Sequence, residues 1–132
     1  MLFRSPLHAC SCSKAVAAFL PELLLTSDME GRLRAYTEFT LTNVNDLEAE
    51  LETIRKRGFA ECVEEIERGL CSVAAPLAPS GPGAAMSIGA AGSVRVFTPA
   101  FRDKLGTRIA RIAQDVSANL GWDVAAAAKL SG

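Results

Sequence analysis

The most reactive side chains of this 132-residue chain are four cysteines and a single histidine. His8, Cys10 and Cys12 lie close together in the sequence, whereas Cys62 and Cys71 lie far downstream. His8 and Cys12 are four residues apart, so they share one face if this segment is helical. Imidazole and thiolate groups bind zinc, and neighbouring thiols also serve in redox sensing. A metal site and a redox site are therefore the first chemistries to consider.

Neither a zinc site nor an active site follows from these residue types alone. Their spacing matches no standard zinc pattern, and Cys71 is expected to point away from the other thiols. A Cys12–His8 nucleophile and base would have no third member, and the sequence shows no glycine-rich phosphate loop or Ser-His-Asp set. We expect reduced cysteines that act as small apolar residues, no cofactor and no enzymatic activity. Metal binding and redox sensing stay as alternatives.

The composition is that of one ordinary globular domain. Fourteen basic and fifteen acidic residues give a net charge of −1, which provides no field for binding nucleic acid or an anionic membrane surface. The longest apolar stretch, Ala15–Leu25, is interrupted by Pro21 and Glu22, so it falls short of the roughly 18 apolar residues of a membrane-spanning helix. A cytoplasmic protein with reduced thiols is expected.

Hydrophobic periodicity and capping residues predict the elements that position these side chains. The predicted helices run from His8 or Cys10 to Leu20, from Pro21 to about Tyr36, from Asn43 to Gly58, and from Thr98 to Gly121. The predicted strands are Phe59–Val63, Leu70–Leu77 and Ala84–Ala90, with a turn at Ser80–Gly83. This order of elements predicts an α+β domain with an antiparallel sheet.

Strand alternation gives the predicted sheet two different faces. The bulky face, which includes Cys71 and Val73, is expected to pack on the last helix. The apolar stripe of that helix consists of Phe101, Leu105, Ile109, Ile112, Val116 and Leu120. The opposite face carries small residues with hydroxyl or thiol groups, namely Ser72, Ser87, Gly89 and Cys62. Such residues leave a hollow that suits a small polar ligand, although close packing against another backbone would also require them.

The start of the first helix is predicted to supply donors for that ligand. The first backbone N–H groups of a helix have no partner within it, and here they fall in the segment Cys10–Lys14. Ser72 and Ser87 can donate to the same ligand from the sheet. This arrangement favours a small carboxylate between the helix start and the sheet. Lys14 is expected to stabilise the helix start or to face solvent, without contacting the ligand.

Four segments, in this order, resemble the effector-binding domain of IclR-type bacterial transcription regulators. They are PLHA, SKA and AFLP within 6–21; YT, TLTN and IRKRGFA within 36–60; EE, G and VAAP within 64–76; and AAMSI at 84–88 with Thr98 and the long last helix. The resemblance covers 6–121. It implies a GAF-like or PAS-like antiparallel sheet with helices packed on one face and a small-molecule pocket on the other. The expected organisation is a partial effector-binding domain over 1–121, incomplete at its N-terminus, and a weakly ordered tail over 122–132.

The resemblance also implies a function and a set of contact residues. A small organic or aromatic acid would change how a linked helix-turn-helix domain, expected to be absent from this chain, binds DNA. Position by position, the ligand contacts of the family fall on Ser11, Cys12, Cys62, Ser72, Ser87 and Gly89. The family often has aspartate in place of Cys62 and serine in place of Gly89. A homodimer or tetramer is expected, and a stand-alone ligand-binding or interaction fragment is the alternative function.

Overall fold

The computed structural model describes residues 8–20, 33–78 and 86–121. These residues form three helices and one antiparallel sheet with the strand order β1-β2-β3. The helices are α1 (Ser11–Ala17), α3 (Val44–Arg57) and α4 (Pro99–Asn119). The strands are β1 (Ala60–Val63), β2 (Leu70–Pro76) and β3 (Ser87–Ser93). The predicted α+β class is confirmed, and none of the described helices is long and apolar enough to cross a membrane.

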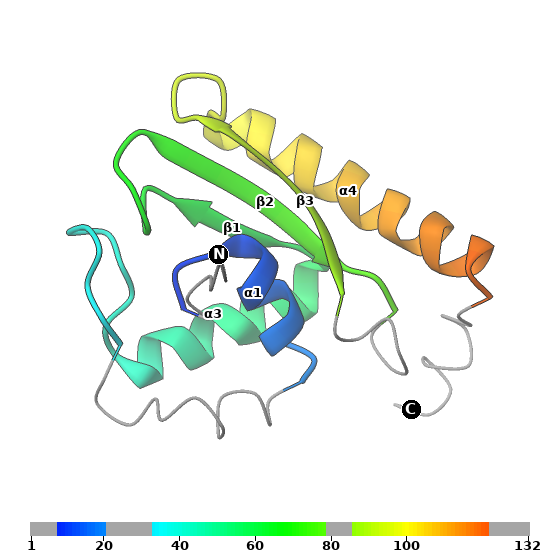
Figure 1. The fold of residues 1–132 in the computed structure, drawn as a ribbon, viewed down its shortest axis with the longest axis horizontal. Helices are drawn as coiled ribbons and strands as arrows, with labels where there is room; N and C mark the ends of the chain where they lie inside the picture. The colour runs from blue at the N-terminus through cyan, green and yellow to red at the C-terminus, as the bar shows by residue number, and fades with distance from the viewer. Residues whose placement is uncertain (1–7, 21–32, 79–85, 122–132) are drawn as a thin grey trace, which may run out of the picture.

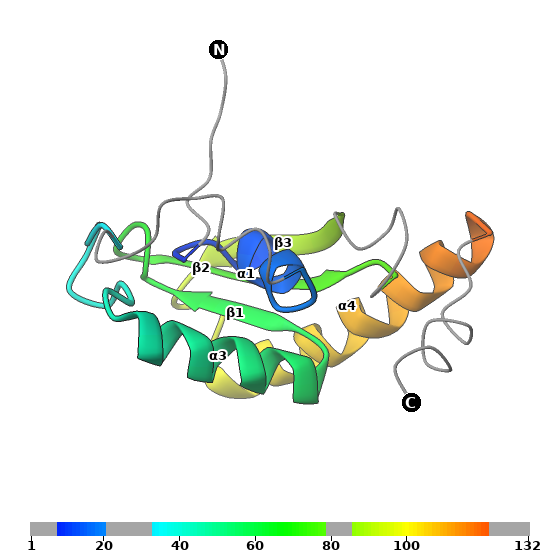
Figure 2. The same ribbon diagram turned by 90° about the horizontal axis from the view of Figure 1, so that it is seen from below.

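The sheet separates two apolar clusters, as the predicted strand alternation requires. On one face, hereafter the α4 face, Cys71 and Val73 pack with Phe59 against α4, which runs along the sheet in Figure 1. On the other face, hereafter the α1 face, α1 contacts all three strands. Figure 2 shows α1 and α4 on opposite sides of the sheet. The second cluster joins α1 to the buried side of α3 and to Ala60 and Ala74 of the sheet.

The residues predicted to bound α3 and α4 have the expected geometry. The side-chain oxygen of Asn43 accepts a hydrogen bond from the Asn45 amide at 2.8 Å, and Gly58 ends α3 with a φ of 90°. Only glycine adopts this left-handed conformation without steric cost. The Thr98 hydroxyl accepts from the Phe101 amide at 3.3 Å at the start of α4. The cap signals therefore predicted both helices correctly.

The third strand lies further along the chain than predicted. It was expected at Ala84–Ala90, whereas β3 runs to Ser93. Gly92 pairs with Cys71 and Ser93 pairs with Leu70, so the ladder continues through residue types that do not favour strands. Pairing with β2 thus overrides the local preference. The predicted turn at 80–83 lies outside the described residues.

The predicted second helix does not extend through residues 33–36. These residues are irregular, and a turn follows in which the Thr40 hydroxyl accepts hydrogen bonds from the amides of Tyr36 and Thr37, each at 3.0 Å. A side chain that bonds to nearby backbone offers the chain an alternative to helix. The remainder of this predicted helix, at 21–32, and the tail at 122–132 lie outside the described residues.

The buried face of α4 is rotated relative to the predicted stripe. Of that stripe, Ile109 is buried, whereas Phe101, Ile112 and Leu120 are exposed. Leu105 and Val116 pack partly against the sheet cluster. The buried residues of α4 are Gly106, Ile109, Ala113 and Ser117. Small residues on this line let the helix approach the sheet closely, and the longer apolar side chains lie on either side of the contact.

We expect the Gly106→Ala variant to be less stable than the wild type. Alanine is preferred over glycine in a helix interior by about 1 kcal/mol, but here its Cβ would lie 2.3 Å from Cδ2 of Phe59. Overpacking of this kind costs about 1–3 kcal/mol. Urea unfolding measures the difference, with the exposed Thr107→Ala as the control. An unchanged or higher midpoint for Gly106→Ala would contradict the close approach of α4 to Phe59.

Candidate functional site

A cavity of about 290 Å³ lies between α1 and the sheet. Its lining consists of Cys10, Ser11, Cys12, Cys62, Ile66, Leu70, Ser72, Gly89, Ala90 and Ala91. The lining contains no Asp, Glu, Lys, Arg or His, and its polar side-chain atoms are hydroxyl oxygens and thiol sulfurs. Sites for small molecules commonly occupy about 300–1,000 Å³, with apolar walls and a few polar groups that orient the ligand. The cavity thus suits a small, mainly apolar molecule with one polar end.

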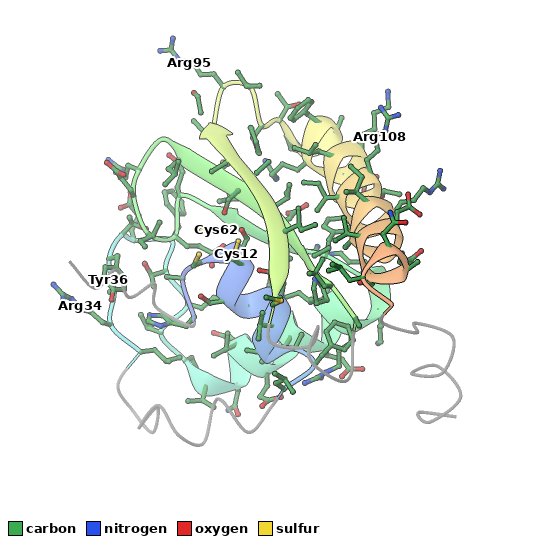
Figure 3. The ribbon with its side chains drawn as sticks, turned by 45° about the vertical axis from the view of Figure 1, so that its right-hand side comes forward. Cys12, Arg34, Tyr36, Cys62, Arg95 and Arg108 are labelled. Carbon is green, nitrogen blue, oxygen red and sulfur yellow. The ribbon has the colours of Figure 1, made fainter. Side chains whose placement is uncertain are left out.

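Five of the six predicted contact residues line this cavity, and they come from four elements. They are Ser11 and Cys12 of α1, Cys62 of β1, Ser72 of β2 and Gly89 of β3. Cys62 and Ser72 are direct partners across the two strands. Figure 3 shows Cys12 and Cys62 near each other, beside α1. Ser87 is not part of the lining; its hydroxyl donates to the carbonyl oxygen of Cys12 at 3.3 Å.

A pair of hydroxyl groups joins α1 to the sheet at the cavity. Ser11 Oγ and Ser72 Oγ lie 2.7 Å apart, so one hydroxyl donates to the other. This bond uses one of the two hydroxyl hydrogens. The second hydrogen can donate to a ligand. One hydroxyl hydrogen is therefore available to a ligand, as predicted for Ser72, and either Ser11 or Ser72 can supply it.

Gly89 leaves room for the sulfur of Cys12 at the cavity wall. A Cβ atom at this position would lie 2.9 Å from the carbonyl oxygen of Val73 and 3.0 Å from Cys12 Sγ. Both separations are shorter than ordinary van der Waals contact. A serine at position 89 would therefore require β2 or Cys12 to shift. The glycine determines how close α1 lies to β3.

Cys10 and Cys12 form an interacting pair of thiols at the start of α1. The pKa of the Cys10 thiol is lowered to about 5, chiefly by the neighbouring Cys12 side chain, and also by the backbone amides of Ser13 and Cys12. The pKa of the Cys12 thiol is raised, mainly by the neighbouring Cys10 side chain and then by burial. The two thiols therefore titrate as an interacting pair, and the first proton leaves at a pH well below that of a free cysteine.

The third thiol of the cavity is protonated at neutral pH. Burial raises the pKa of Cys62, and the nearby Glu65 carboxylate raises it further. Its Sγ donates a hydrogen bond to the carbonyl oxygen of Ala9 at 3.2 Å. Cys62 therefore contributes a neutral, weakly polar side chain to the cavity wall. A carboxylate side chain at this position would instead repel an anionic ligand.

His8 does not join these thiols. It precedes α1, which begins at Ser11, so the predicted shared helical face of His8 and Cys12 is wrong. The His8 Nε2 instead donates to the carbonyl oxygen of Arg34 at 2.8 Å, and the ring lies against Tyr36. Within 8–20, 33–78 and 86–121, no group of three or more His, Cys, Asp or Glu side chains is arranged to hold a metal ion.

Lys14 is fully buried, so of its two predicted placements, at the helix start or toward solvent, the solvent-facing one is wrong. Its Nζ lies 3.0 Å from Glu65 Oε1, 3.2 Å from Glu65 Oε2 and 3.5 Å from Glu50 Oε1. Glu65 also accepts a hydrogen bond from the Val63 amide at 3.1 Å. The ammonium group therefore ties α1 to α3 and to the connection between β1 and β2. Lys14 is not part of the cavity lining.

Five lining residues were not among the predicted contacts, namely Cys10, Ile66, Leu70, Ala90 and Ala91. Strand alternation carried a signal for Leu70, which is on the same face as Ser72. Ala91 lies beyond the predicted end of the third strand. Ile66 lies in the irregular connection after β1, where no periodic pattern applies. For Cys10 the sequence indicated a helix start and a free thiol, and not a place in the cavity wall.

Comparison with known proteins identifies the family. The family described as bacterial transcriptional regulator IclR C-terminal matches residues 3–118. The glycerol operon regulatory protein of Streptomyces griseus is 32% identical over 118 residues, which cover 88% of this chain and 46% of that protein. The HTH-type transcriptional regulator BhcR of Paracoccus denitrificans is 32% identical over 115 residues, 86% of this chain and 41% of that protein. These relatives are transcriptional regulators and not enzymes.

Solved structures agree with this match. The IclR of Thermotoga maritima superposes with a TM-score of 0.77 at 31% identity, over 92% of this chain and 51% of that chain. The repressor BlcR of Agobacterium tumefaciens gives 0.78 at 22% identity, over 90% and 49%, which shows the shared fold. The chain thus spans about half the length of these regulators. It belongs to the IclR family of bacterial transcriptional regulators and corresponds to their C-terminal domain.

Proposed function

We propose that this chain is the effector-sensing part of an IclR-type regulator and that its cavity binds a small organic acid. The observation that carries the proposal is the cavity between α1 and the sheet, which five of the six expected contact residues line. Its walls combine apolar surface with a small number of hydroxyl and thiol groups. This combination suits a ligand with a compact hydrocarbon body and one polar end.

The two ends of such an acid have different partners in the cavity. The hydrocarbon body would contact Ile66, Leu70 and Ala91. A carboxylate removed from water needs hydrogen-bond donors, and the Ser11–Ser72 hydroxyl pair supplies one. The backbone amides of Cys12 and Ser13, which lie at the start of α1 and lower the pKa of the Cys10 thiol, supply others. The carboxylate would thus compete with the Cys10 sulfur for these amides.

A relative with the same fold supports this ligand class. The structure of the PobR inducer-binding domain from Acinetobacter, a double mutant, is a complex with 3-hydroxybenzoic acid. It superposes on this chain with a TM-score of 0.71 at 20% identity, over 94% of this chain and 69% of that chain. In that protein the fold is an inducer-binding domain that accepts an aromatic acid. We extend the ligand class, and not the particular compound, to the present cavity.

We assign the response to the ligand, a change in DNA binding, to a separate helix-turn-helix domain. A ligand between α1 and the sheet would contact both and so favour one position of α1, which is how a ligand shifts a conformational equilibrium. DNA binding would take place only through the linked domain, in the cytoplasm and as a homo-oligomer. The net charge of −1 agrees with this division, since the sensing part itself has no excess of cations for phosphate contacts.

Acid binding is expected to weaken as the pH rises from 5 to 8. The pKa of Cys10 is about 5, so below that pH its thiol is neutral, whereas above it the thiolate competes for the same amides and repels a carboxylate. If acid binding requires a protonated Cys10, the Kd rises by up to about tenfold per pH unit. The Cys10→Ser variant should bind more tightly at pH 7.5 and lose this dependence.

Calorimetric titration of the 132-residue chain tests the proposed ligand class and the competition together. Benzoate and 3-hydroxybenzoate serve as the acids, and benzyl alcohol serves as a neutral ligand of similar size. Saturable binding of an acid, tighter than that of benzyl alcohol, would support the proposal. Equal or tighter binding of benzyl alcohol would argue against a carboxylate site. A Kd independent of pH, and equal in Cys10→Ser, would remove the competition with Cys10.

A further inference from the structure

A buried ion pair that does not itself line the cavity joins two of the cavity walls. Ser11 and Cys12 of α1 form one wall, and Ile66, in the connection between β1 and β2, forms part of another. Lys14 lies in the same helix as the first wall, and Glu65 directly precedes Ile66. The Lys14 Nζ lies 3.0 and 3.2 Å from the two carboxylate oxygens of Glu65. We propose that this pair fixes the Ile66 wall relative to α1 and thereby sets the size of the acid that the cavity accepts.

The burial of the pair makes its geometry specific. The Lys14 side chain is fully buried and the Glu65 side chain is 12% exposed. Charges removed from water require well-placed partners. Lys14 has a second partner in Glu50 Oε1 at 3.5 Å, and the Glu65 carboxylate also accepts from the Val63 amide at 3.1 Å. Displacement of Glu65 would separate the buried ammonium group from its nearest anion. The cost of that displacement holds Glu65, and with it the adjacent Ile66, in one position.

The connection at 64–69 transmits this restraint because it is a short loop closed at its neck. Both end residues have left-handed conformations, with φ of 56° at Glu64 and 83° at Gly69. Glu64 Oε1 accepts a hydrogen bond from the Gly69 amide at 2.9 Å, and the Glu64 amide donates to the carbonyl oxygen of Leu70 at 2.9 Å. A short loop whose ends are tied moves as a unit, so the position of Glu65 determines that of Ile66.

A second set of contacts attaches the same connection to the turn at 36–40. The Thr37 and Thr40 hydroxyls donate to the carbonyl oxygens of Glu64 and Glu65. An ion pair between Arg68 and Glu38, whose side chains are 70% and 52% exposed, lies on the solvent side. Of the hydrogen bonds and ion pairs among residues 8–20, 33–78 and 86–121, only those of Lys14 join this connection to α1. The exposed Arg68–Glu38 pair is therefore a matched control for the buried one.

Replacement of the buried pair by apolar residues is expected to release the wall. The double variant Lys14→Met with Glu65→Leu removes both charges, and apolar contact is not directional. The connection can then move outward at little cost, which admits a larger acid, while a small acid loses the benefit of a preorganised site. Glu65→Gln, which keeps one oxygen for Lys14, is a milder variant and should act in the same direction if the double variant does not fold. The expected change in selectivity rests on the proposed acid binding.

Calorimetric titration of the 132-residue chain with benzoate and with 2-naphthoate measures this selectivity. The ratio of the two Kd values should shift toward 2-naphthoate by roughly tenfold in the double variant, the lower end of the effect of one methylene group in an apolar pocket. Ile66→Ala enlarges the cavity directly and should shift the ratio in the same direction. Arg68→Ala with Glu38→Ala should leave the ratio unchanged. An unchanged ratio in the Lys14 and Glu65 double variant, or an equal shift in the Arg68 and Glu38 control, would overturn the proposal.

Amide hydrogen exchange tests the same link with no acid present. The Gly69 amide donates to Glu64 Oε1, and the Leu70 amide donates to the carbonyl oxygen of Glu67 at 3.2 Å, so neither bond involves the replaced side chains. Both amides should exchange roughly tenfold faster in the double variant, because opening of the loop costs less free energy. The exposed-pair control should exchange like the wild type.

The two measurements separate failure of the inference from failure of the proposed function. If the wild type bound neither acid, the proposed function would be wrong, and the exchange rates would still decide whether the pair holds the wall. If the wild type bound an acid but the double variant changed neither the Kd ratio nor the exchange rates, the role assigned to Lys14 and Glu65 would be wrong while the acid site remained.

Discussion

Replacement of Lys14 by alanine is expected to destabilise the domain by about 3–5 kcal/mol, the usual cost of removing one partner from a buried ion pair. Lys14 is fully buried, and its ammonium group lies 3.0 Å from Glu65 Oε1. The variant would leave the Glu65 carboxylate, which is only 12% exposed, without its cation. Because domains of this size are stable by about 5–15 kcal/mol, a loss of this size would unfold a measurable fraction of the protein.

Two further variants separate the lost charge from other effects. The exposed Lys56→Ala, on α3, should change the free energy of unfolding by less than about 0.5 kcal/mol. The double variant Lys14→Met with Glu65→Leu removes both charges and should recover much of the stability, since apolar replacement of a whole buried pair is often neutral. Denaturant unfolding measures all three. If Lys14→Ala stayed within 1 kcal/mol of the wild type, the ion pair would not be what holds α1 on the sheet.

The Ser72→Leu variant is expected to lower the affinity for the bound acid by at least about 100-fold, equivalent to about 2.7 kcal/mol. Ser72 lies in β2 and lines the cavity, so a leucine side chain would occupy the space proposed for the ligand. It would also remove the hydroxyl that is 2.7 Å from Ser11 Oγ. The unfolding midpoint should stay close to that of the wild type, because the added side chain enters an empty volume. Calorimetry with 3-hydroxybenzoate and thermal unfolding measure the two effects separately.

Smaller changes at the same site show which property matters. Ser72→Ala keeps the space but removes a hydroxyl, and the loss of one hydrogen bond of about 1 kcal/mol should weaken binding roughly fivefold. Ser93→Leu, at an exposed position of β3, should leave affinity unchanged. If Ser72→Leu failed to fold, position 72 would belong to the core and the ligand pocket would be wrong.

The parts of the fold that depend on local signals were predictable from the sequence. Asn43 and Gly58 bound α3, and Thr98 begins α4, because caps act within one turn of the chain. Strand alternation also predicted that Ser72 and Cys71 lie on opposite faces. That separation puts Cys62, Ser72 and Gly89 on the cavity side of the sheet, whereas Ser11 and Cys12 were expected as contacts from the family resemblance.

The remainder depends on contacts between distant residues. Lys14 is buried because Glu50 and Glu65, 36 and 51 residues away, lie beside it, and a sequence pattern does not reveal such pairs. The contact line of α4 follows from the fit of Gly106 against Phe59 and not from the longer apolar side chains of the predicted stripe. The lowered pKa of Cys10 likewise arises at the N-cap of α1, where Cys10 is extended while the neighbouring Cys12 is helical.

Amide chemical shifts report the location of a bound acid residue by residue. The ¹⁵N-labelled chain would be titrated with 3-hydroxybenzoate, with benzyl alcohol as the neutral control. We predict saturable shifts of the amides of Ser11, Cys12, Cys62, Ser72 and Gly89, while Ile109 and Ala113, on the α4 side of the sheet, remain unchanged. Saturable shifts centred on α4, with the amides of α1 and the cavity strands unaffected, would show that the acid does not bind between α1 and the sheet.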